Sequence, residues 1–171
     1  MKTKIEQTDH LQGKATAPVI LLEYGDYQCP YCRKAYYIIK EIQKELGDKM
    51  SLVFRNFPLT DLHPHALNAA LAAEAADKQG KFWQMHDMLF ENQHFLENEN
   101  LLDYARQLGL NIEQFKKDFS SEAVVAKVKK DYESGVNANI GGTPTFFVNG
   151  KPYEGNWTSP DFALDLKSLA E

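Results

Sequence analysis

Cysteine is scarce in this sequence, with only two among 171 residues, Cys29 and Cys32. A small disulfide-stabilised domain needs several cysteine pairs, and a protein with several structural zinc ions needs more thiol ligands. Both classes are therefore excluded. All of the cysteine chemistry is confined to one short segment, Cys29-Pro30-Tyr31-Cys32.

Long apolar runs are also missing. The longest near the N-terminus covers residues 19–22, whereas a membrane-spanning helix needs about 20 apolar residues. Residues 1–17 are interrupted by charged side chains and lack the apolar core of a secretory signal. We therefore expect no membrane span and a cytoplasmic location for the sequence as it stands. Export, for example to a periplasm, is the alternative if a signal peptide has been removed.

Basic residues are outnumbered, 19 against 24 acidic ones, which gives a net charge of −5 at pH 7. No extended basic stripe is present, so a nucleic-acid partner is not expected. Hydrophobic residues make up 43% of the chain, while glycine and proline number only ten and seven. This composition excludes an intrinsically disordered, collagen-like or low-complexity chain.

The first part of the chain has the pattern strand, helix, strand. Residues 18–24 are apolar and rich in β-favouring side chains, which predicts a buried strand. Residues 30–46 carry apolar side chains three and four positions apart, which predicts a helix with Pro30 in its first turn. Residues 50–57 form the next predicted strand. This order is typical of a βαβ unit.

The pattern changes to consecutive helices between residues 64 and 139. It returns to strands with a predicted hairpin, in which Asn149-Gly150 joins residues 145–148 to a return strand at residues 151–154. A final helix is expected to have Ser159 as its N-cap and Pro160 at its first position. The sequence therefore predicts an α/β fold interrupted by an all-helical insertion. The predicted helices of the insertion cover residues 65–79, 81–91, 99–108, 111–119 and a run that begins at Ser121.

The two cysteines lie between a predicted buried strand and the start of a predicted helix. A thiolate is the reactive form of cysteine, and the free N–H groups of a helix N-terminus stabilise it. Cysteines at positions i and i+3 of the first turn are also close enough to form a disulfide. We expect Cys29 to be the outer, low-pKa nucleophile and Cys32 the more buried thiol that resolves the mixed disulfide. The alternatives are an inert thiol pair and a zinc site completed by His63 and His65.

Residues 23–32, EYGDYQCPYC, resemble the active-site segment of the DsbA-like thiol-disulfide oxidoreductases of the thioredoxin superfamily. The resemblance covers nearly the whole chain and includes the Ala-rich helix and the late Thr143-Pro144-Thr145. It implies a thioredoxin-like fold (β-α-β … β-β-α), with residues 1–61 and 140–171 in the thioredoxin-like domain and residues 62–139 in an inserted helical domain. It also implies that Pro144 is a cis-proline lying against the catalytic disulfide, and that a substrate segment pairs with Thr143.

Two further residues follow from this resemblance. Glu23 stands on the strand before Cys29, where the superfamily often has a buried acid, and such an acid could exchange a proton with Cys32. The alternative is a half-exposed glutamate without a role.

Tyr31 departs from the family pattern, because the strongest oxidants of this type have histidine there. Tyrosine stabilises a thiolate less, so we expect an intermediate redox potential. Pro30, Tyr31 and Thr143 are expected to contact substrate.

The expected function is dithiol–disulfide exchange with protein substrates through the Cys-Pro-Tyr-Cys site. A separate, unidentified redox partner would recycle the enzyme, and no cofactor or metal is expected. The main alternative is a chaperone-like module that binds unfolded polypeptides and makes little use of its cysteines. A small-molecule enzyme that uses glutathione is a third candidate. Relatives of that kind typically carry serine at the nucleophile position, which argues against it here.

Overall fold

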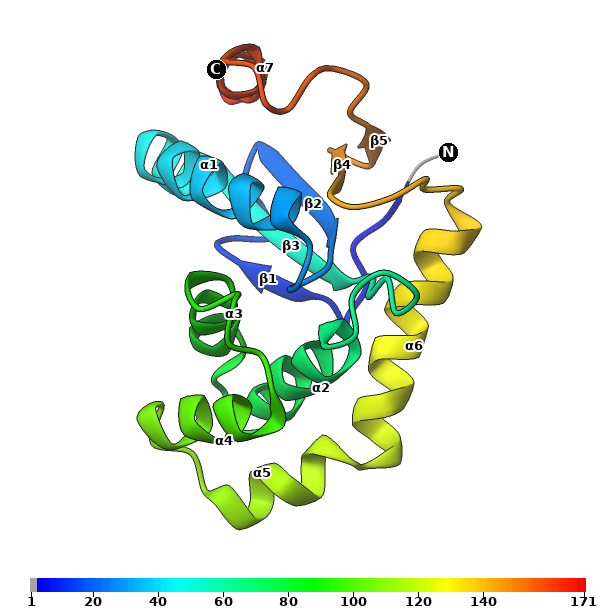
Figure 1. The fold of residues 1–171 in the computed structure, drawn as a ribbon. Helices are drawn as coiled ribbons and strands as arrows, with labels where there is room; N and C mark the ends of the chain where they lie inside the picture. Colours follow the sequence, from blue (N-terminus) through cyan, green and yellow to red (C-terminus); the bar gives the residue numbers. More distant parts are fainter. Residues whose placement is uncertain (1–2) are drawn as a thin grey trace.

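The computed structural model describes residues 3–171 and has a five-stranded mixed sheet at its centre (Figure 1). Two of the strands, β2 and β3, run parallel, and the other neighbouring pairs are antiparallel. This arrangement confirms the predicted α/β class. In spatial order the strands are β1 (His10–Gln12), β3 (Met50–Asn56), β2 (Val19–Gly25), β4 (Thr145–Val148) and β5 (Lys151–Pro152).

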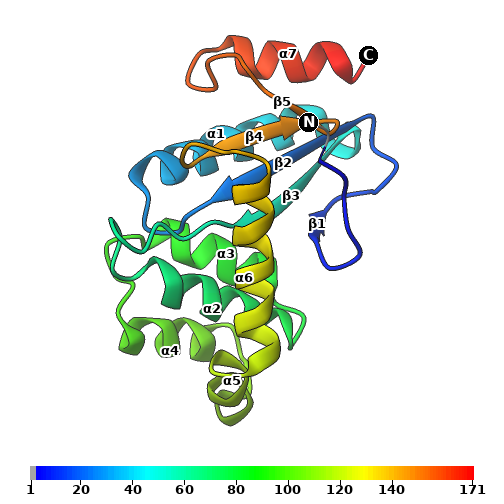
Figure 2. The same ribbon diagram turned by 90° about the vertical axis from the view of Figure 1, so that its right-hand side faces the viewer.

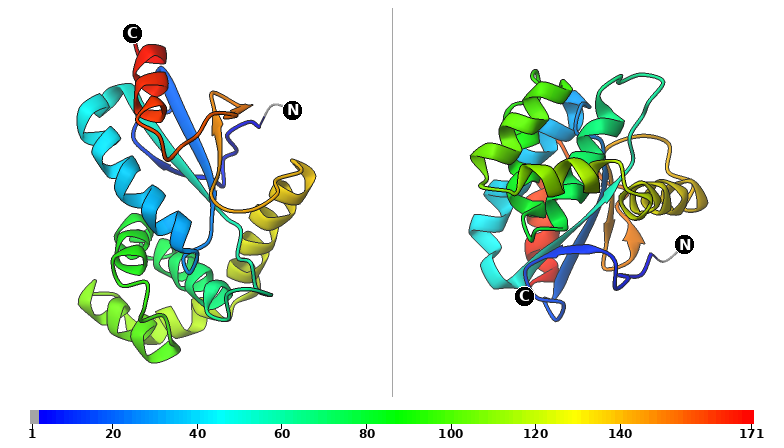
Figure 3. Two further views of the ribbon diagram at one scale, coloured as in Figure 1. Left: turned by 45° about the horizontal axis from the view of Figure 1, so that its top comes forward. Right: turned by 90° about the horizontal axis from the view of Figure 1, so that it is seen from below.

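Helices cover both faces of this sheet. On one face α1 (Pro30–Leu46) and α7 (Asp161–Leu169) share an apolar core with β2, β3 and β4, and α7 lies beside α1 (Figure 3). The opposite face meets the C-terminal end of α6 (Glu122–Asn137), after which Ala138 and Ile140 pack against a core that includes Leu22 and Phe147. The predicted helix over residues 30–46 has the observed bounds, and a short 3₁₀ turn, η1 (Gly47–Lys49), leads from it to β3.

Five consecutive helices separate β3 from β4. Figure 2 shows α2, α3 and α4 below the sheet, with α6 running from α5 back up to it. Helices α2 to α5 share a core with Tyr27, Tyr36 and Phe54 from the sheet side of the molecule, and α6 packs on α2 in a separate cluster. The division into residues 62–139 and the remainder as two domains stays a prediction. The helices are α2 (Ala66–Asp77), α3 (Phe82–Glu91), α4 (Asn98–Gln107), α5 (Ile112–Phe119) and α6.

Besides shifts of one or two residues at the ends of other elements, three details differ from the predictions. The return strand β5 covers only Lys151–Pro152, although the N–H of Tyr153 still donates to the carbonyl oxygen of Phe146 at 2.9 Å. The final helix begins one residue later than predicted, with Pro160 as its N-cap, although Ser159 Oγ still accepts from Asp161 N at 3.2 Å. The edge strand β1 was not predicted at all.

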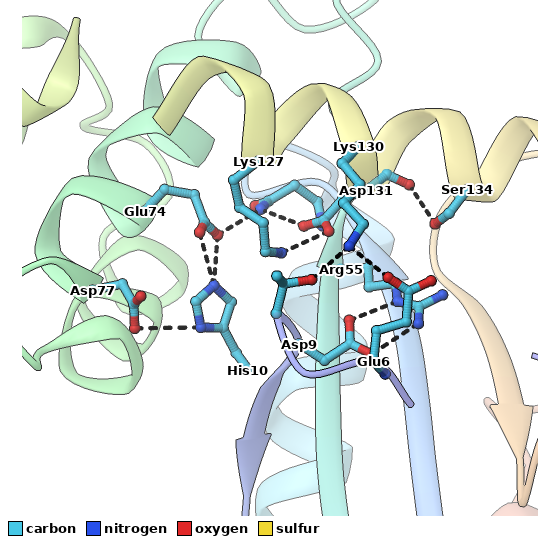
Figure 4. Close-up of polar contacts among 12 residues, drawn as sticks. Glu6, Asp9, His10, Arg55, Glu74, Asp77, Lys127, Lys130, Asp131 and Ser134 are labelled. Atoms are coloured by element: carbon cyan, nitrogen blue, oxygen red, sulfur yellow. Dashed lines mark hydrogen bonds and ion pairs between the residues drawn. The ribbon is translucent and has the colours of Figure 1, made fainter. Parts of the chain in front are cut away.

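A buried polar network fastens β1 to the helical region (Figure 4). Nε2 of His10 lies 2.7 Å from an oxygen of Glu74 in α2, and Nδ1 lies 3.4 Å from Asp77. Burial opposes the imidazolium charge, but the bonds to Asp77 and Glu74 outweigh it and raise the pKa of His10 to about 9. Next to it, Arg55 of β3 forms two 2.8 Å hydrogen bonds to Asp9.

The raised pKa of His10 predicts a loss of stability at alkaline pH. The pKa of His10 is about 9 in the folded protein and 6.5 in the unfolded chain, so protonated His10 stabilises the fold. This contribution is fully present below pH 6.5 and is lost as pH rises through 9. From pH 7 to 10 we expect the wild type to lose about 2 kcal/mol more than a His10→Gln variant. Urea unfolding over this range measures the difference. The control is His94→Gln, an exposed histidine; parallel curves for wild type and His10→Gln would contradict the prediction.

None of the helices formed by residues 3–171 is long and apolar enough to cross a membrane.

Candidate active site

The two cysteines sit where β2 ends and α1 begins. Cys29 is the N-cap of α1, Pro30 is its first residue and Cys32 lies in its first turn. Pro30 fits this position because the first N–H groups of a helix have no intrahelical partner. Both thiols are free, with Cys29 4% exposed and Cys32 fully buried.

The environment of Cys29 favours its thiolate. A hydrogen bond from the Cys32 thiol lowers the pKa of Cys29 to about 6, against the opposing effect of burial. Backbone N–H groups of Cys32 and Tyr31 contribute in the same direction, as expected at a helix N-terminus. As a thiol, Cys29 Sγ lies 3.6 Å from the carbonyl oxygen of Thr143.

Cys32 has the opposite environment. Burial raises its pKa well above the ordinary value, and the hydrogen bond that it donates to Cys29 and the nearby Glu23 act in the same direction. The backbone N–H of Asp26 lies 3.4 Å from Cys32 Sγ and works against this rise. The site therefore contains one thiol that ionises readily and one that stays protonated.

Glu23 lies on β2 between Phe54 of β3 and Phe146 of β4. It is 2% exposed, and its Oε1 has no hydrogen-bond partner. Burial, followed by the charge of Cys29, raises the pKa of Glu23 to about 8. Glu23 is thus buried and not half-exposed, and its role stays a prediction.

The loop before β4, which contains Thr143 and Pro144, lies against Cys29. The Thr143–Pro144 peptide bond is cis, and the Thr143 carbonyl faces Cys29. The Thr143 hydroxyl is buried without a hydrogen-bond partner. Tyr31 stands out of the surface with 65% of its area exposed. The structure therefore brings Cys29, Cys32, Glu23 and Thr143 together at one end of the sheet and leaves Tyr31 on the surface.

Two neighbours of the cysteines were not predicted. Asp26 contacts Cys32 as described, and Gln93 donates from Nε2 to the carbonyl oxygens of Tyr27 and Cys29, each at 2.9 Å. Asp26 lies within residues 23–32, the segment that resembles the family's active site, so the sequence did place it close to the cysteines. Gln93 lies after α3, and nothing in its local sequence points to Cys29.

The zinc alternative has no geometric support. His63 Nδ1 is bonded to Asp26 Oδ2 at 2.8 Å. Within residues 3–171, the one close group of three or more side chains able to hold a metal is His10, Glu74 and Asp77, and it includes neither cysteine.

A comparison with known proteins agrees with this site. The sequence model of the family described as Thioredoxin matches residues 5–166. The crystal structure of oxidised BdbD from Bacillus subtilis is 30% identical with a TM-score of 0.81, covering 94% of this chain and 91% of BdbD. A thioredoxin-like oxidoreductase from Silicibacter pomeroyi DSS-3 is 27% identical with a TM-score of 0.81, covering 97% and 95% of the two chains.

The chain also matches part of a larger protein. It is 42% identical over 164 residues to the Na(+)/H(+) antiporter NhaA 1 of Mycobacterium sp. strain KMS. The match covers 95% of this chain but only 27% of the antiporter, so the chain spans about a quarter of the curated relatives it matches. The family match over residues 5–166 and the likeness to BdbD together show that the chain belongs to the thioredoxin family.

Proposed function

We propose that this protein catalyses dithiol–disulfide exchange on protein substrates through Cys29 and Cys32. The observation that carries the proposal is the contrast between two adjacent free thiols, one with a pKa lowered to about 6 and one buried with a raised pKa. A thiolate is the attacking species in disulfide exchange, and a protonated neighbour provides the second step. An inert thiol pair would not need this contrast.

In the reducing direction, the Cys29 thiolate attacks one sulfur of a substrate disulfide. A bond forms between Cys29 and the substrate, and the other substrate sulfur leaves as a thiolate. Cys32 then gives up its proton and attacks Cys29 Sγ, which releases the second substrate thiolate. Two electrons pass to the substrate, and a Cys29–Cys32 disulfide remains. The reverse sequence oxidises a substrate dithiol.

Glu23 is proposed to carry the proton of Cys32. A general acid–base group works best when its pKa lies near the working pH, and the pKa of Glu23 is about 8. Pro144 and Thr143 are proposed to align the substrate, because an extended segment could pair with the Thr143 backbone while its sulfur meets Cys29. Pro30 and the exposed Tyr31 would form the remaining contact surface.

A redox titration tests the proposal. The reduced protein is equilibrated in glutathione buffers, and alkylation then separates the dithiol from the disulfide form. We expect one two-electron transition at a potential between about −120 mV, the strongest oxidants, and about −270 mV, thioredoxin. If no reversible transition occurs, the proposal fails and the polypeptide-binding alternative takes its place.

Tyr31 is expected to set where in this range the potential falls. A Tyr31→His variant places a possible cation beside Cys29, which stabilises the thiolate and hence the reduced form. We expect the potential to rise by about 30 mV, equal to about tenfold in the exchange equilibrium. Tyr31→Phe, which keeps the ring, is the control and should titrate like the wild type. A potential for Tyr31→His at or below that of the wild type would show the reasoning to be wrong.

A further inference from the structure

Asp26 is a buried carboxylate at the active site with no part in the steps above. It follows β2 directly and is 1% exposed. Its Oδ1 accepts from the backbone N–H of Gln28 at 2.7 Å, and its Oδ2 accepts from the backbone N–H of Leu59 at 2.8 Å. The third donor is Nδ1 of His63, at 2.8 Å from Oδ2. One side chain thus joins the turn before α1 to the loop after β3.

The backbone of Asp26 touches both cysteines. Its N–H points at Cys32 Sγ over 3.4 Å, and its carbonyl oxygen accepts from the Cys29 N–H at 3.1 Å. The side-chain bonds of Asp26 therefore fix the orientation of the two peptide groups that contact the cysteines.

This contact matters because Cys32 must carry a negative charge during exchange. It is a thiolate when it attacks Cys29 in the reducing direction, and it leaves as a thiolate in the oxidising direction. Cys32 is fully buried, and burial disfavours its charged form. A backbone N–H aimed at the sulfur stabilises that charge without any rearrangement at the moment of reaction.

His63 is the part of this arrangement that reaches the surface. Its side chain is 20% exposed, whereas that of Asp26 is fully buried. His63 also lines a cavity of about 310 Å³ beside Pro30, together with His94 and Glu97. The His63 imidazole therefore both donates to the buried Asp26 carboxylate and lines that cavity.

We propose that Asp26 is a positioning residue for dithiol–disulfide exchange, which holds its own N–H on Cys32 Sγ, and that His63 keeps the Asp26 carboxylate in place. The inference rests on the proposed function and deepens it. It assigns Asp26 and His63 to the step in which the Cys32–Cys29 bond forms or breaks, and not to the first attack by Cys29.

The test separates the two steps with glutathione disulfide as the probe. Cys29 of the reduced protein attacks one glutathione sulfur and releases one glutathione thiolate. Cys32 then attacks Cys29 Sγ and releases the second, so the protein loses the two electrons that the glutathione disulfide gains. Acid quenching at successive times and mass spectrometry measure the mixed disulfide and the Cys29–Cys32 disulfide. The rates of attack and of resolution follow from the two curves.

Asp26→Asn should slow resolution by about tenfold, because the amide NH₂ cannot accept from the donors that hold the turn. Attack by Cys29 should stay within about twofold, and the Cys29 pKa measured by alkylation should stay near 6. His63→Ala should slow resolution in the same way, and His63→Gln, which keeps an N–H donor, should restore part of the rate. His65→Ala is the matched control on the same loop and should resolve like the wild type.

The outcomes distinguish this inference from the function on which it rests. Equal slowing of attack and resolution, or resolution at the wild-type rate in His63→Ala, would overturn the positioning role. If Asp26→Asn does not fold, the comparison of His63→Ala with His63→Gln decides alone. A wild-type protein that forms neither the mixed disulfide nor the Cys29–Cys32 disulfide would overturn the proposed function itself.

Discussion

A Cys29→Ser variant is expected to lose disulfide exchange by a factor of at least about 1000, because a serine hydroxyl does not ionise at neutral pH and forms no disulfide. The wild-type thiol is activated, with a pKa near 6. Reduction of a disulfide-bonded peptide, followed by alkylation and mass spectrometry, measures the rate. Wild-type activity in the variant would exclude Cys29 as the nucleophile.

The paired variant Cys32→Ser should behave differently. Cys29 remains able to attack, but nothing resolves the intermediate, so a mixed disulfide with the peptide should accumulate. Both substitutions are nearly isosteric, and each should change the free energy of unfolding by only about 1–2 kcal/mol. Suppression of aggregation of an unfolded protein is the parallel assay. If Cys29→Ser retains that suppression and the wild type shows no exchange, the protein is a binding module.

Replacing Glu23 by Gln is expected to stabilise the reduced protein at neutral and alkaline pH. The pKa of Glu23 is raised from an ordinary 4.5 to about 8. The folded protein therefore holds a proton that the unfolded chain releases, and its stability falls as pH rises between these two values. Between pH 5 and pH 8 the wild type should lose about 3–4 kcal/mol relative to the variant, because glutamine resembles the protonated acid at every pH.

Urea unfolding of the reduced proteins from pH 5 to pH 9 measures this difference. The control is Glu41→Gln on the exposed face of α1, which should follow the wild-type curve. The same Glu23→Gln variant should resolve mixed disulfides more slowly, because Cys32 loses its proton acceptor. Identical pH curves for wild type and Glu23→Gln would contradict the raised pKa of Glu23, and with it the argument that Glu23 is poised to exchange a proton near neutral pH.

The order of residues was enough to predict the helix that carries the cysteines. Its apolar side chains recur at helical spacing, Pro30 opens it, and its observed bounds are Pro30–Leu46. These are local signals, and local signals also predicted helices that start at Asn111 and Ser121, which the structure shows as N-caps whose side chains accept from Gln114 N and Val124 N. The dithiol chemistry was predictable for the same reason, because both cysteines belong to one turn.

Strand β1 could not be predicted in this way. His10–Gln12 forms a strand because it pairs with the free edge of β3, and His10 is held there by Glu74 from a distant helix. Its three residues have no alternation long enough to mark a strand. The contacts of Asp26 with Leu59 and His63 have the same origin, since they join segments that are adjacent only after folding.

Residue order settled which groups are present: two thiols at a helix start, an acid on the preceding strand and a proline on a late loop. Their protonation was decided by tertiary structure. The pKa of about 8 for Glu23 follows first from its burial in the sheet, and the pKa of about 6 for Cys29 follows from the Cys32 thiol, burial and the distant Thr143. The physical reason is that desolvation and electrostatic interactions depend on distances in space, and packing of the sheet against α1 and the Thr143 loop creates those distances.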